Sequence, residues 1–356
     1  MALLIGMDEA GLGPNLGPFV VAATVWDVPS PRSGFDFWAA FESVLTRSPS
    51  SCDLRLHVAD SKQVFQPSRG IRALERGVWS ALQLCEVQAR SFRELCESLS
   101  GTEAHSGPLA PRLGDNASAS RIALVERSLF DDDELVAARA GLSEPLHRDD
   151  ADAPPWYGAE SLALPVESSD VSLVEPWRLA CERLGVRLVT MRADVVEPSR
   201  FNRLVRQYDN KAAATSRIAM NLLRGIWHPD DETEALVVAD KHGGRNRYEP
   251  LLSEAFDGAN VITVEEGAER STYRVGKGEL RFQPRAEEYG PVALASMTAK
   301  YLRELAMHQF NAFWRRHLPD IKPTQGYPLD AKRFRAEIVE TQRKLEITDD
   351  VLWRER

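Results

Sequence analysis

Residues 3–14 read LLIGMDEAGLGP, an apolar run that carries two adjacent carboxylates into a glycine-rich turn. The run predicts a β-strand ending at Met7, whose side chains alternate between the two faces of a sheet. Gly11 and Gly13 let a backbone pass close to a bulky group such as a phosphate. Asp8 and Glu9 therefore indicate a divalent-cation site, although acidic pairs at strand ends also occur in solvated turns and helix caps.

The sequence around this segment predicts a mixed α/β sheet flanked by helices. A β-rich run follows the glycine turn and would form a hairpin with the first strand. Elsewhere, apolar residues recur every three or four positions, which indicates amphipathic helices between further strands. The expected elements are strands at 18–26, 184–190 and 235–240, a hairpin at 271–282, and helices at 67–85, 212–227 and 291–317.

The organisation of the chain follows from its size and charge. With 356 residues, of which 43% are hydrophobic, it can form one large or two smaller domains. Residues 101–180 hold 15 acidic and 6 basic residues, and the rest of the chain balances at 38 of each. We interpret 98–178 as an acidic insertion or lid, with a poorly ordered surface excursion as the alternative. The core would occupy 1–97 and 179–310, and 311–356 would form a helical C-terminal extension.

Composition also limits the cellular setting. No apolar run approaches the roughly 18 residues of a membrane helix, and the opening run lacks the features of a signal peptide. We therefore expect a cytoplasmic monomer that binds no membrane. Cys52, Cys85, Cys96 and Cys181 are far apart without a C-x-x-C spacing, which favours reduced thiols over a zinc site or disulfide scaffold. The balanced charge outside the acidic segment is compatible with a local basic surface for nucleic acid.

A second strand end repeats the pattern of the first. An apolar run ends in Asp240, and Glu287 and Glu288 stand just ahead of a predicted helix. At one edge of a sheet, these acids would converge with Asp8 and Glu9 and hold two Mg²⁺ or Mn²⁺ ions. Each has a structural alternative, because Asp240 can cap a turn and the glutamate pair favours a helix N-terminus.

Five short motifs occur in a fixed order along the chain. They are GMDEAGLGP at 6–14 with Gly-Pro at 17–18, DSK at 60–62, VVAD at 237–240, ASMTAK at 295–300 and GYP at 326–328. In this order they resemble the motifs of the type 2 ribonucleases H, the family of ribonuclease HII, which cut the RNA strand of RNA/DNA hybrids. The match covers about 1–95 and 184–335 and leaves the acidic insertion outside.

The resemblance implies a ribonuclease H-like fold and two-metal-ion hydrolysis by an endoribonuclease. Asp8, Glu9 and Asp240 would be catalytic metal ligands for Mg²⁺ or Mn²⁺. Glu287 is the best candidate for the fourth ligand, and Glu288 stays open because the alignment needs a one-residue gap. Glutamate in place of the family's usual aspartate resembles the type 3 branch, ribonuclease HIII. The implied substrate is an RNA/DNA hybrid or duplex DNA that contains ribonucleotides.

The resemblance also implies a surface that binds the substrate. Lys62, Ser296 and Lys300 would approach backbone phosphates, and an exposed helix charge is the alternative for Lys300. Tyr327 would stack on a sugar near the cleavage point, with an ordinary half-buried aromatic as the alternative. The glycine motif, with Gly11, Leu12 and Gly13, would help to recognise the ribose 2′-hydroxyl.

One position departs from the family. Type 2 ribonucleases H usually have arginine between the two glycines, whereas Leu12 cannot donate a hydrogen bond from its side chain, which leaves specificity for single ribonucleotides open.

The alternative function is a catalytically weakened nucleic-acid-binding protein that retains the fold, and a phosphohydrolase of small substrates is a third hypothesis. His242 is a further candidate for proton transfer or phosphate contact, with an ordinary turn histidine as the alternative.

Overall fold

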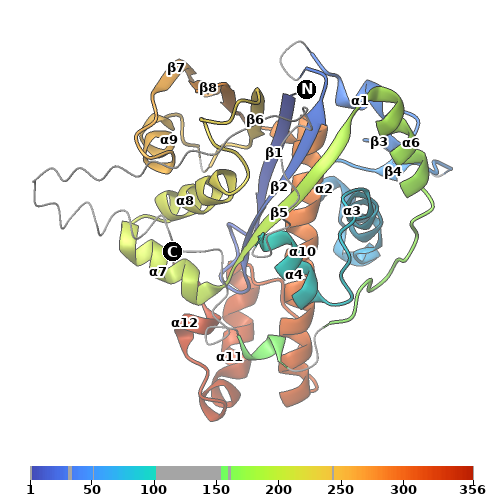
Figure 1. The fold of residues 1–356 in the computed structure, drawn as a ribbon. Coiled ribbons are helices and arrows are strands. Elements are labelled where there is room, and N and C mark those ends of the chain that lie inside the picture. Colours follow the sequence, from blue (N-terminus) through green and yellow to red (C-terminus); the bar gives the residue numbers. More distant parts are fainter. Residues whose placement is uncertain are drawn as a thin grey trace, which may run out of the picture.

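The structure is a computed structural model that describes residues 2–30, 34–50, 52–101, 154–158, 162–242 and 244–355. Within these ranges, seven strands form one mixed sheet (Figure 1). Two short strands, β3 (Leu45–Thr46) and β4 (Leu56–His57), pair separately in parallel. Across the large sheet the order is β5 (Arg187–Val196), β2 (Phe19–Val28), β1 (Ala2–Ala10), β6 (Ala235–Ala239), β9 (Gly278–Phe282), β8 (Ser271–Val275) and β7 (Val261–Glu266).

Helices cover both faces of this sheet, so the predicted α/β class is confirmed (Figure 1). The first layer packs around the long helix α10, and the second covers the opposite face. The first layer contains α10 (Gly290–His317), α3 (Arg72–Leu84), α4 (Phe92–Ser100) and α6 (Val174–Leu184), with the short α1 (Phe37–Ala40) and α2 (Ser61–Val64) beside it. The second contains α7 (Pro198–Tyr208), α8 (Lys211–Arg224) and α9 (Glu249–Ala255).

β1 separates two apolar cores. Its side chains alternate, so that Leu4 packs in the core with α10, whereas Ile5 and Met7 pack in the core with α8. The predicted hairpin of β1 and β2 is confirmed. The expected strand end at Met7 is wrong, because Asp8 and Glu9 stay paired with β2 and the strand continues to Ala10.

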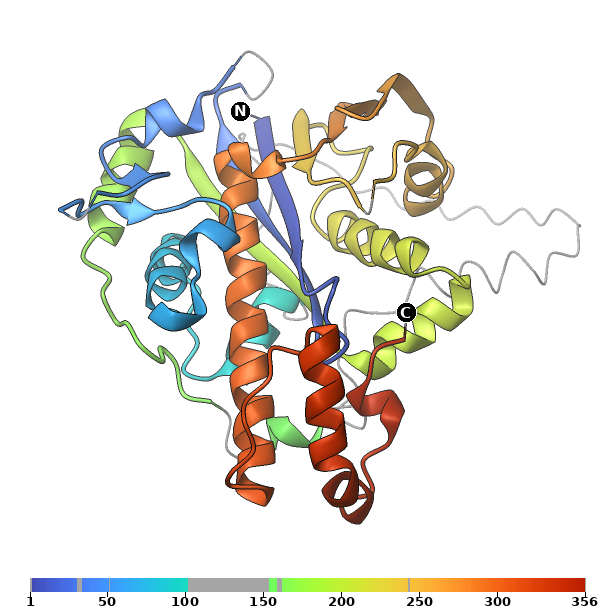
Figure 2. The same cartoon turned by 180° about the vertical axis from the view of Figure 1, so that it is seen from behind.

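α10 crosses β1 at very short distance. A Cβ atom on Gly6 would lie 2.3 Å from the carbonyl carbon of Pro291 and 2.3 Å from the amide nitrogen of Val292. Only glycine leaves room for this approach, which brings the first turn of α10 against the middle of β1. Figure 2 shows α10 running along the sheet from this crossing.

The C-terminal extension is helical, as the sequence predicted. α11 (Pro328–Lys344) and α12 (Asp349–Leu352) lie beside the far end of α10 (Figure 2). The chain then returns to the sheet, where Trp353 forms a β-bridge with Leu16. The last described residues therefore contact the loop that follows β1.

Most of the predicted acidic insertion, residues 102–153 and 159–161, lies outside the described residues. Within the described part of 98–178, Trp156 and Trp177 pack in the core and are 2% and 0% exposed. The expected border at 178 falls inside α6, because this helix buries Trp177 and Ala180 on the same face. The core therefore includes the C-terminal flank of the segment.

Other predicted elements are confirmed with shifted ends. The helices expected at 67–85, 212–227 and 291–317 are α3, α8 and α10, and α3 begins only at Arg72 because a separate 3-10 turn precedes it. The strand expected at 184–190 begins at Arg187, after α6 has ended, and runs to Val196. Among the helices in the described ranges, none has the combination of length and apolar character needed to span a membrane.

Candidate active site

The register of the sheet places two acids side by side. β6 runs parallel to β1, with Ala239 opposite Met7. Asp8 and Asp240 are the next residues, so they occupy neighbouring positions at one edge of the sheet. Asp8 is 7% exposed and faces α10, whereas alternation along the strand turns Glu9 toward the other layer.

A 3-10 turn adds the third acid. β9 pairs with β6, and the chain then turns through η4 (Ala286–Glu288) into α10. Carboxylate oxygens of Asp8, Asp240 and Glu287 all lie within 4.8 Å of one another. Glu288 is exposed and lies outside this group. We refer to Asp8, Asp240 and Glu287 as the acidic triad.

Burial and mutual repulsion disfavour the ionised triad. Burial raises the pKa of Asp8 to about 8, a hydrogen bond from Ser296 opposes this, and the charge of Glu287 adds to it. Burial is also the main reason why the pKa values of Asp240 and Glu287 are raised, and repulsion by neighbouring carboxylates contributes in both. In the described ranges, no lysine or arginine lies within 4.0 Å of these carboxylates.

The triad therefore fits a divalent metal ion. Its ligand atoms are hard carboxylate oxygens, which Mg²⁺ and Mn²⁺ prefer. A bound cation would also supply the compensating charge that the triad does not receive through a direct ion pair, and it would lower the raised pKa values.

Glu9 stands outside the triad. Its Oε2 lies 3.9 Å from Nε2 of His242, and burial and the charges of Asp8 and Asp240 raise the pKa of Glu9 well above its usual range. The sequence predicted that four carboxylates converge. The structure brings three of them together and places Glu9 on the opposite face of β1. His242 is 4% exposed, Nδ1 contacts Oγ of Ser216 at 3.2 Å, and burial lowers the pKa of the imidazole to about 4. It is a buried neutral histidine in the bend that follows β6.

Lys62 brings a positive charge to the triad. α2 begins after Asp60, whose carboxylate accepts a 3.0 Å hydrogen bond from the amide of Lys62. Burial alone would lower the pKa of Lys62, but the charges of Asp60, Glu287, Asp8 and others raise it. Since its side chain is exposed and charged, Lys62 is suited to a phosphate contact at this edge.

Two other predicted phosphate ligands are engaged within the protein. Ser296 is 2% exposed, its Oγ lies 3.1 Å from Oγ of Ser61, and its hydroxyl forms a hydrogen bond with the carboxyl group of Asp8. Nζ of Lys300 lies 2.6 Å from Oε1 of Glu304, with its side chain only 16% exposed. Ser296 thus orients Asp8, Lys300 is held in an ion pair, and a phosphate contact by either stays a prediction.

The glycine loop, residues 11–16, follows directly after β1. Gly11 has φ +91°, and a Cβ atom there would lie 2.7 Å from Nε of Arg303, so the position requires glycine. The side chain of Leu12 packs against the apolar core around α8. Its carbonyl oxygen accepts a 2.9 Å hydrogen bond from Nζ of Lys211. Leu12 therefore contributes its backbone, and not a polar side chain, to this surface.

Tyr327 adjoins the glycine loop. A Cβ atom on Gly13 would lie 3.8 Å from Cε1 of Tyr327, which is ordinary van der Waals contact. Tyr327 is the N-cap residue of α11, and it is 52% exposed. An exposed ring beside a glycine backbone offers a flat surface on which a sugar or base can stack.

Sequence reasoning missed Arg303, which lies behind the loop. It is 1% exposed, and Nη2 donates a 2.9 Å hydrogen bond to the carbonyl oxygen of Gln325. The available signal was a charged residue on the apolar stripe of a predicted helix, four residues after Ala299 and three before Ala306. A charge at such a position is expected to have a specific partner.

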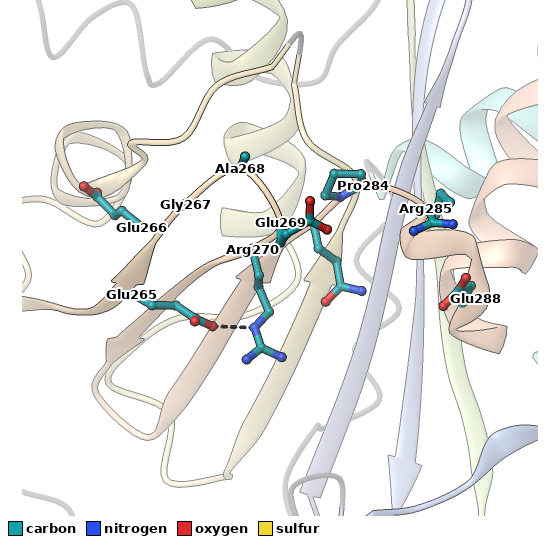
Figure 3. Close-up of a pocket in the computed structure, with 10 residues that line it drawn as sticks. Glu265, Glu266, Gly267, Ala268, Glu269, Arg270, Pro284, Arg285 and Glu288 are labelled. Carbon is teal, nitrogen blue, oxygen red and sulfur yellow. Dashed lines mark hydrogen bonds and ion pairs between the residues drawn. The ribbon is translucent and has the colours of Figure 1, made fainter.

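Two pockets adjoin residues 284–285, in the segment that leads into η4. One, of about 400 Å³, is lined by Asp240, Lys241, Asn246 and Arg285, among others. The second, of about 470 Å³, lies between the β7–β8 hairpin and the segment that leads into η4 (Figure 3). Its lining contains four glutamates and only two arginines, so it is poorly suited to a phosphate.

Comparisons with known proteins give matches among solved structures. Neither a scan against family models nor a search of curated proteins finds a match. The PCNA:RNase HII complex from Archaeoglobus fulgidus matches at 12% identity and a TM-score of 0.37, over 99% of this chain and 94% of that one. Ribonuclease H2 from Pyrococcus horikoshii OT3 matches at 12% identity and a TM-score of 0.39, over 98% and 92%. Bst-RNase HIII in complex with Mn²⁺ matches at 16% identity and a TM-score of 0.37, over 99% and 66%. Each of these matches is a similarity to a solved ribonuclease HII or HIII, and the α/β class of the chain itself follows from its mixed sheet and the helices on both faces.

Proposed function

We propose that this protein is a divalent-metal-dependent endoribonuclease that hydrolyses the RNA strand of RNA/DNA hybrids, or ribonucleotides within duplex DNA, by two-metal-ion catalysis. The observation that carries the proposal is the convergence of Asp8, Asp240 and Glu287 from three distant parts of the chain. The order of the five motifs supports the same conclusion.

The acidic triad would hold Mg²⁺ or Mn²⁺, and Glu9, whose pKa is raised by burial and by the nearby charges of Asp8, Asp240 and Glu287, would be a further ligand. Such ions supply a water of lowered pKa and a positive charge at the departing 3′ oxygen, so the products carry a 5′-phosphate and a 3′-hydroxyl. Ser296 holds the carboxylate of Asp8 in place through its hydrogen bond.

Other residues of the chain would bind and orient the duplex. Lys62 presents an exposed ammonium beside the triad, where it would neutralise a backbone phosphate. Tyr327 would stack on the sugar next to the cleaved bond, and the backbone of Gly11 and Gly13 would contact the ribose 2′-hydroxyl. Lys62 and Tyr327 are both exposed, which suits contacts along a duplex better than the enclosure of a small molecule.

A cleavage assay tests the proposal. A labelled RNA/DNA hybrid is incubated with Mn²⁺ and the wild type, Asp8→Asn, Asp240→Asn or Glu288→Gln. We expect the first two variants to lose activity by about a thousandfold or more, since each removes a metal ligand, and Glu288→Gln to retain it. Equal cleavage by the wild type and both Asn variants would contradict the assignment. Duplexes with one, four or continuous ribonucleotides then define the substrate.

The second candidate is a nucleic-acid-binding protein with weakened catalysis. It is favoured by Leu12, whose side chain packs against the apolar core around α8 at the position where the family usually has arginine. Calorimetric titration with Mn²⁺ separates the two functions, because a surface that only binds phosphate gains nothing from buried carboxylates. Absence of Mn²⁺ binding by the wild type would support the binding protein.

A further inference from the structure

We propose that the C-terminal tail, residues 353–355, fixes the glycine loop and thereby sets how tightly the protein binds its duplex. The tail would be a positioning element, and Arg354 its main positioning residue. The inference rests on the proposed function only in assuming that the glycine loop contacts the substrate.

The tail contacts the glycine loop at successive residues. Trp353 and Leu16 form an antiparallel β-bridge. The amide of Arg354 donates a 2.9 Å hydrogen bond to the carbonyl oxygen of Asn15, and its guanidinium donates from Nη2 to the carbonyl oxygen of Pro14. Three consecutive loop residues therefore depend on residues more than 300 positions later.

Arg354 is an unusual residue for a purely structural contact. It is 1% exposed, and Nε and Nη1 have no hydrogen-bond partner among the described residues. Burial lowers the pKa of Arg354 to about 9, with Arg303 adding to the effect and Glu197 opposing it, so the side chain remains charged at pH 7. Burying a guanidinium is costly, and within the described residues the one side-chain hydrogen bond of Arg354 goes to the glycine loop.

The tail is itself anchored on α7. Nδ2 of Asn202 donates a 2.8 Å hydrogen bond to the carbonyl oxygen of Trp353, and Oδ1 accepts one of 2.8 Å from the amide of Glu355. Arg206 forms an ion pair of 2.6 Å with Glu355. Asn202 thus holds the tail from the side opposite the loop, which allows the tail to be released without altering the loop sequence.

The glycine loop also contacts the segment that precedes α11. The amide of Asn15 donates a 2.7 Å hydrogen bond to the carbonyl oxygen of Gly326, which immediately precedes Tyr327. Because Gly13 lies next to the Tyr327 ring, the tail fixes the loop relative to the stacking residue. The acidic triad contains no member of this network, so loosening the loop should weaken duplex binding and leave metal binding intact.

The test uses Arg354→Met, which keeps volume without donors, and Arg354→Lys, which keeps charge. Asn202→Ala releases the tail from α7, and Arg343→Ala is the control because Arg343 is exposed in the last turn of α11. For Arg354→Met and Asn202→Ala we expect KM for the hybrid to rise about tenfold with kcat within about threefold. Arg354→Lys should recover part of the loss, and Arg343→Ala should match the wild type.

Two further measurements separate positioning from general damage. Mn²⁺ affinity should be unchanged in all variants, and hydrogen exchange at Asn15 and Leu16 should accelerate in Arg354→Met and Asn202→Ala. The double variant should lose little more than either single one, because both act through the tail. Unchanged exchange and unchanged KM in folded Asn202→Ala would overturn the proposal, even if Arg354→Met fails to fold.

Failure of the proposed role of the tail can be distinguished from failure of the proposed function. If the wild type neither cleaves nor binds hybrids, the nuclease assignment fails, whereas hydrogen exchange still decides whether the tail holds the loop. If the wild type is active and the exchange changes without a change in KM, the tail is structural only and the positioning role is rejected.

Discussion

Carboxylate oxygens of Asp8 and Glu287 lie within 4.8 Å of each other, although the two residues are 279 positions apart in the chain. Their approach depends on the crossing of α10 over Gly6, which brings η4 to the edge of the sheet where β1 ends. Asp240 reaches the same edge through the parallel pairing of β6 with β1.

Metal binding should depend on Glu287 and not on its neighbour. Glu287→Gln removes a charged ligand from the triad and should weaken Mn²⁺ binding by about tenfold or more in calorimetric titration. Glu288→Gln is the matched control, because Glu288 is exposed and its carboxylate lies outside the triad. Equal effects of the two substitutions would show that η4 does not present Glu287 to the metal.

The metal-free protein should become less stable as the pH rises from 6.5 to 8. Burial raises the pKa of Asp8 to about 8 from an ordinary 3.8, so in this window the folded state binds a proton that the unfolded state has lost. Stability from Asp8 then falls by up to about 1.4 kcal/mol per pH unit. His242, with its pKa lowered to about 4, contributes an increase with pH that is nearly complete above 6.5.

Urea unfolding in EDTA at several pH values measures this slope. Asp8→Asn should reduce the slope, and saturating Mn²⁺ should stabilise the protein most at the upper end of the window, because metal binding requires ionised carboxylates. A metal-free wild type whose stability rises between pH 6.5 and 8 would contradict the burial of an uncompensated Asp8.

Gly6→Ala should be strongly destabilising. The new methyl group would lie 2.3 Å from backbone atoms of Pro291 and Val292, and neither can move without shifting α10. We expect a loss of about 3 kcal/mol in the free energy of unfolding. Gly267→Ala is the control, because its Cβ would meet only the carbonyl oxygen of Arg270 at 3.6 Å, and it should change stability by less than about 0.5 kcal/mol. Thermal unfolding of both variants measures this difference in stability.

Glu75→Gln should also destabilise the protein. The Glu75 carboxylate is 0% exposed and accepts hydrogen bonds of 2.6–2.7 Å from the amides of Val166, Glu167 and Ser168. Glutamine turns a donor toward these amides, and the expected loss is about 3 kcal/mol. The exposed Glu182→Gln should stay within about 0.5 kcal/mol of the wild type. An unchanged midpoint of thermal unfolding for Glu75→Gln would show that Glu75 does not hold residues 166–168.

Part of the site was predictable from local patterns. The apolar run before Asp8 and the one before Asp240 indicated strands that end in acids, and the helix after Glu287 was evident from its spacing. Lys62 also stood out, in a motif ahead of a helix. The position of Glu9 was not predictable, because the strand continues past Met7 and its pairing with β2 holds Glu9 on the face opposite Asp8.

The sequence by itself determined the strands, the long helices and the acids that follow or precede them, because alternation and helical period are local properties of the chain. Only the tertiary structure decided that Glu287 and not Glu288 joins Asp8, and that Arg354 reaches the loop after β1. These distances depend on sheet register and on the angle at which α10 and the C-terminal tail cross the sheet. Such long-range geometry arises from packing of whole elements and leaves no periodic signal in the sequence.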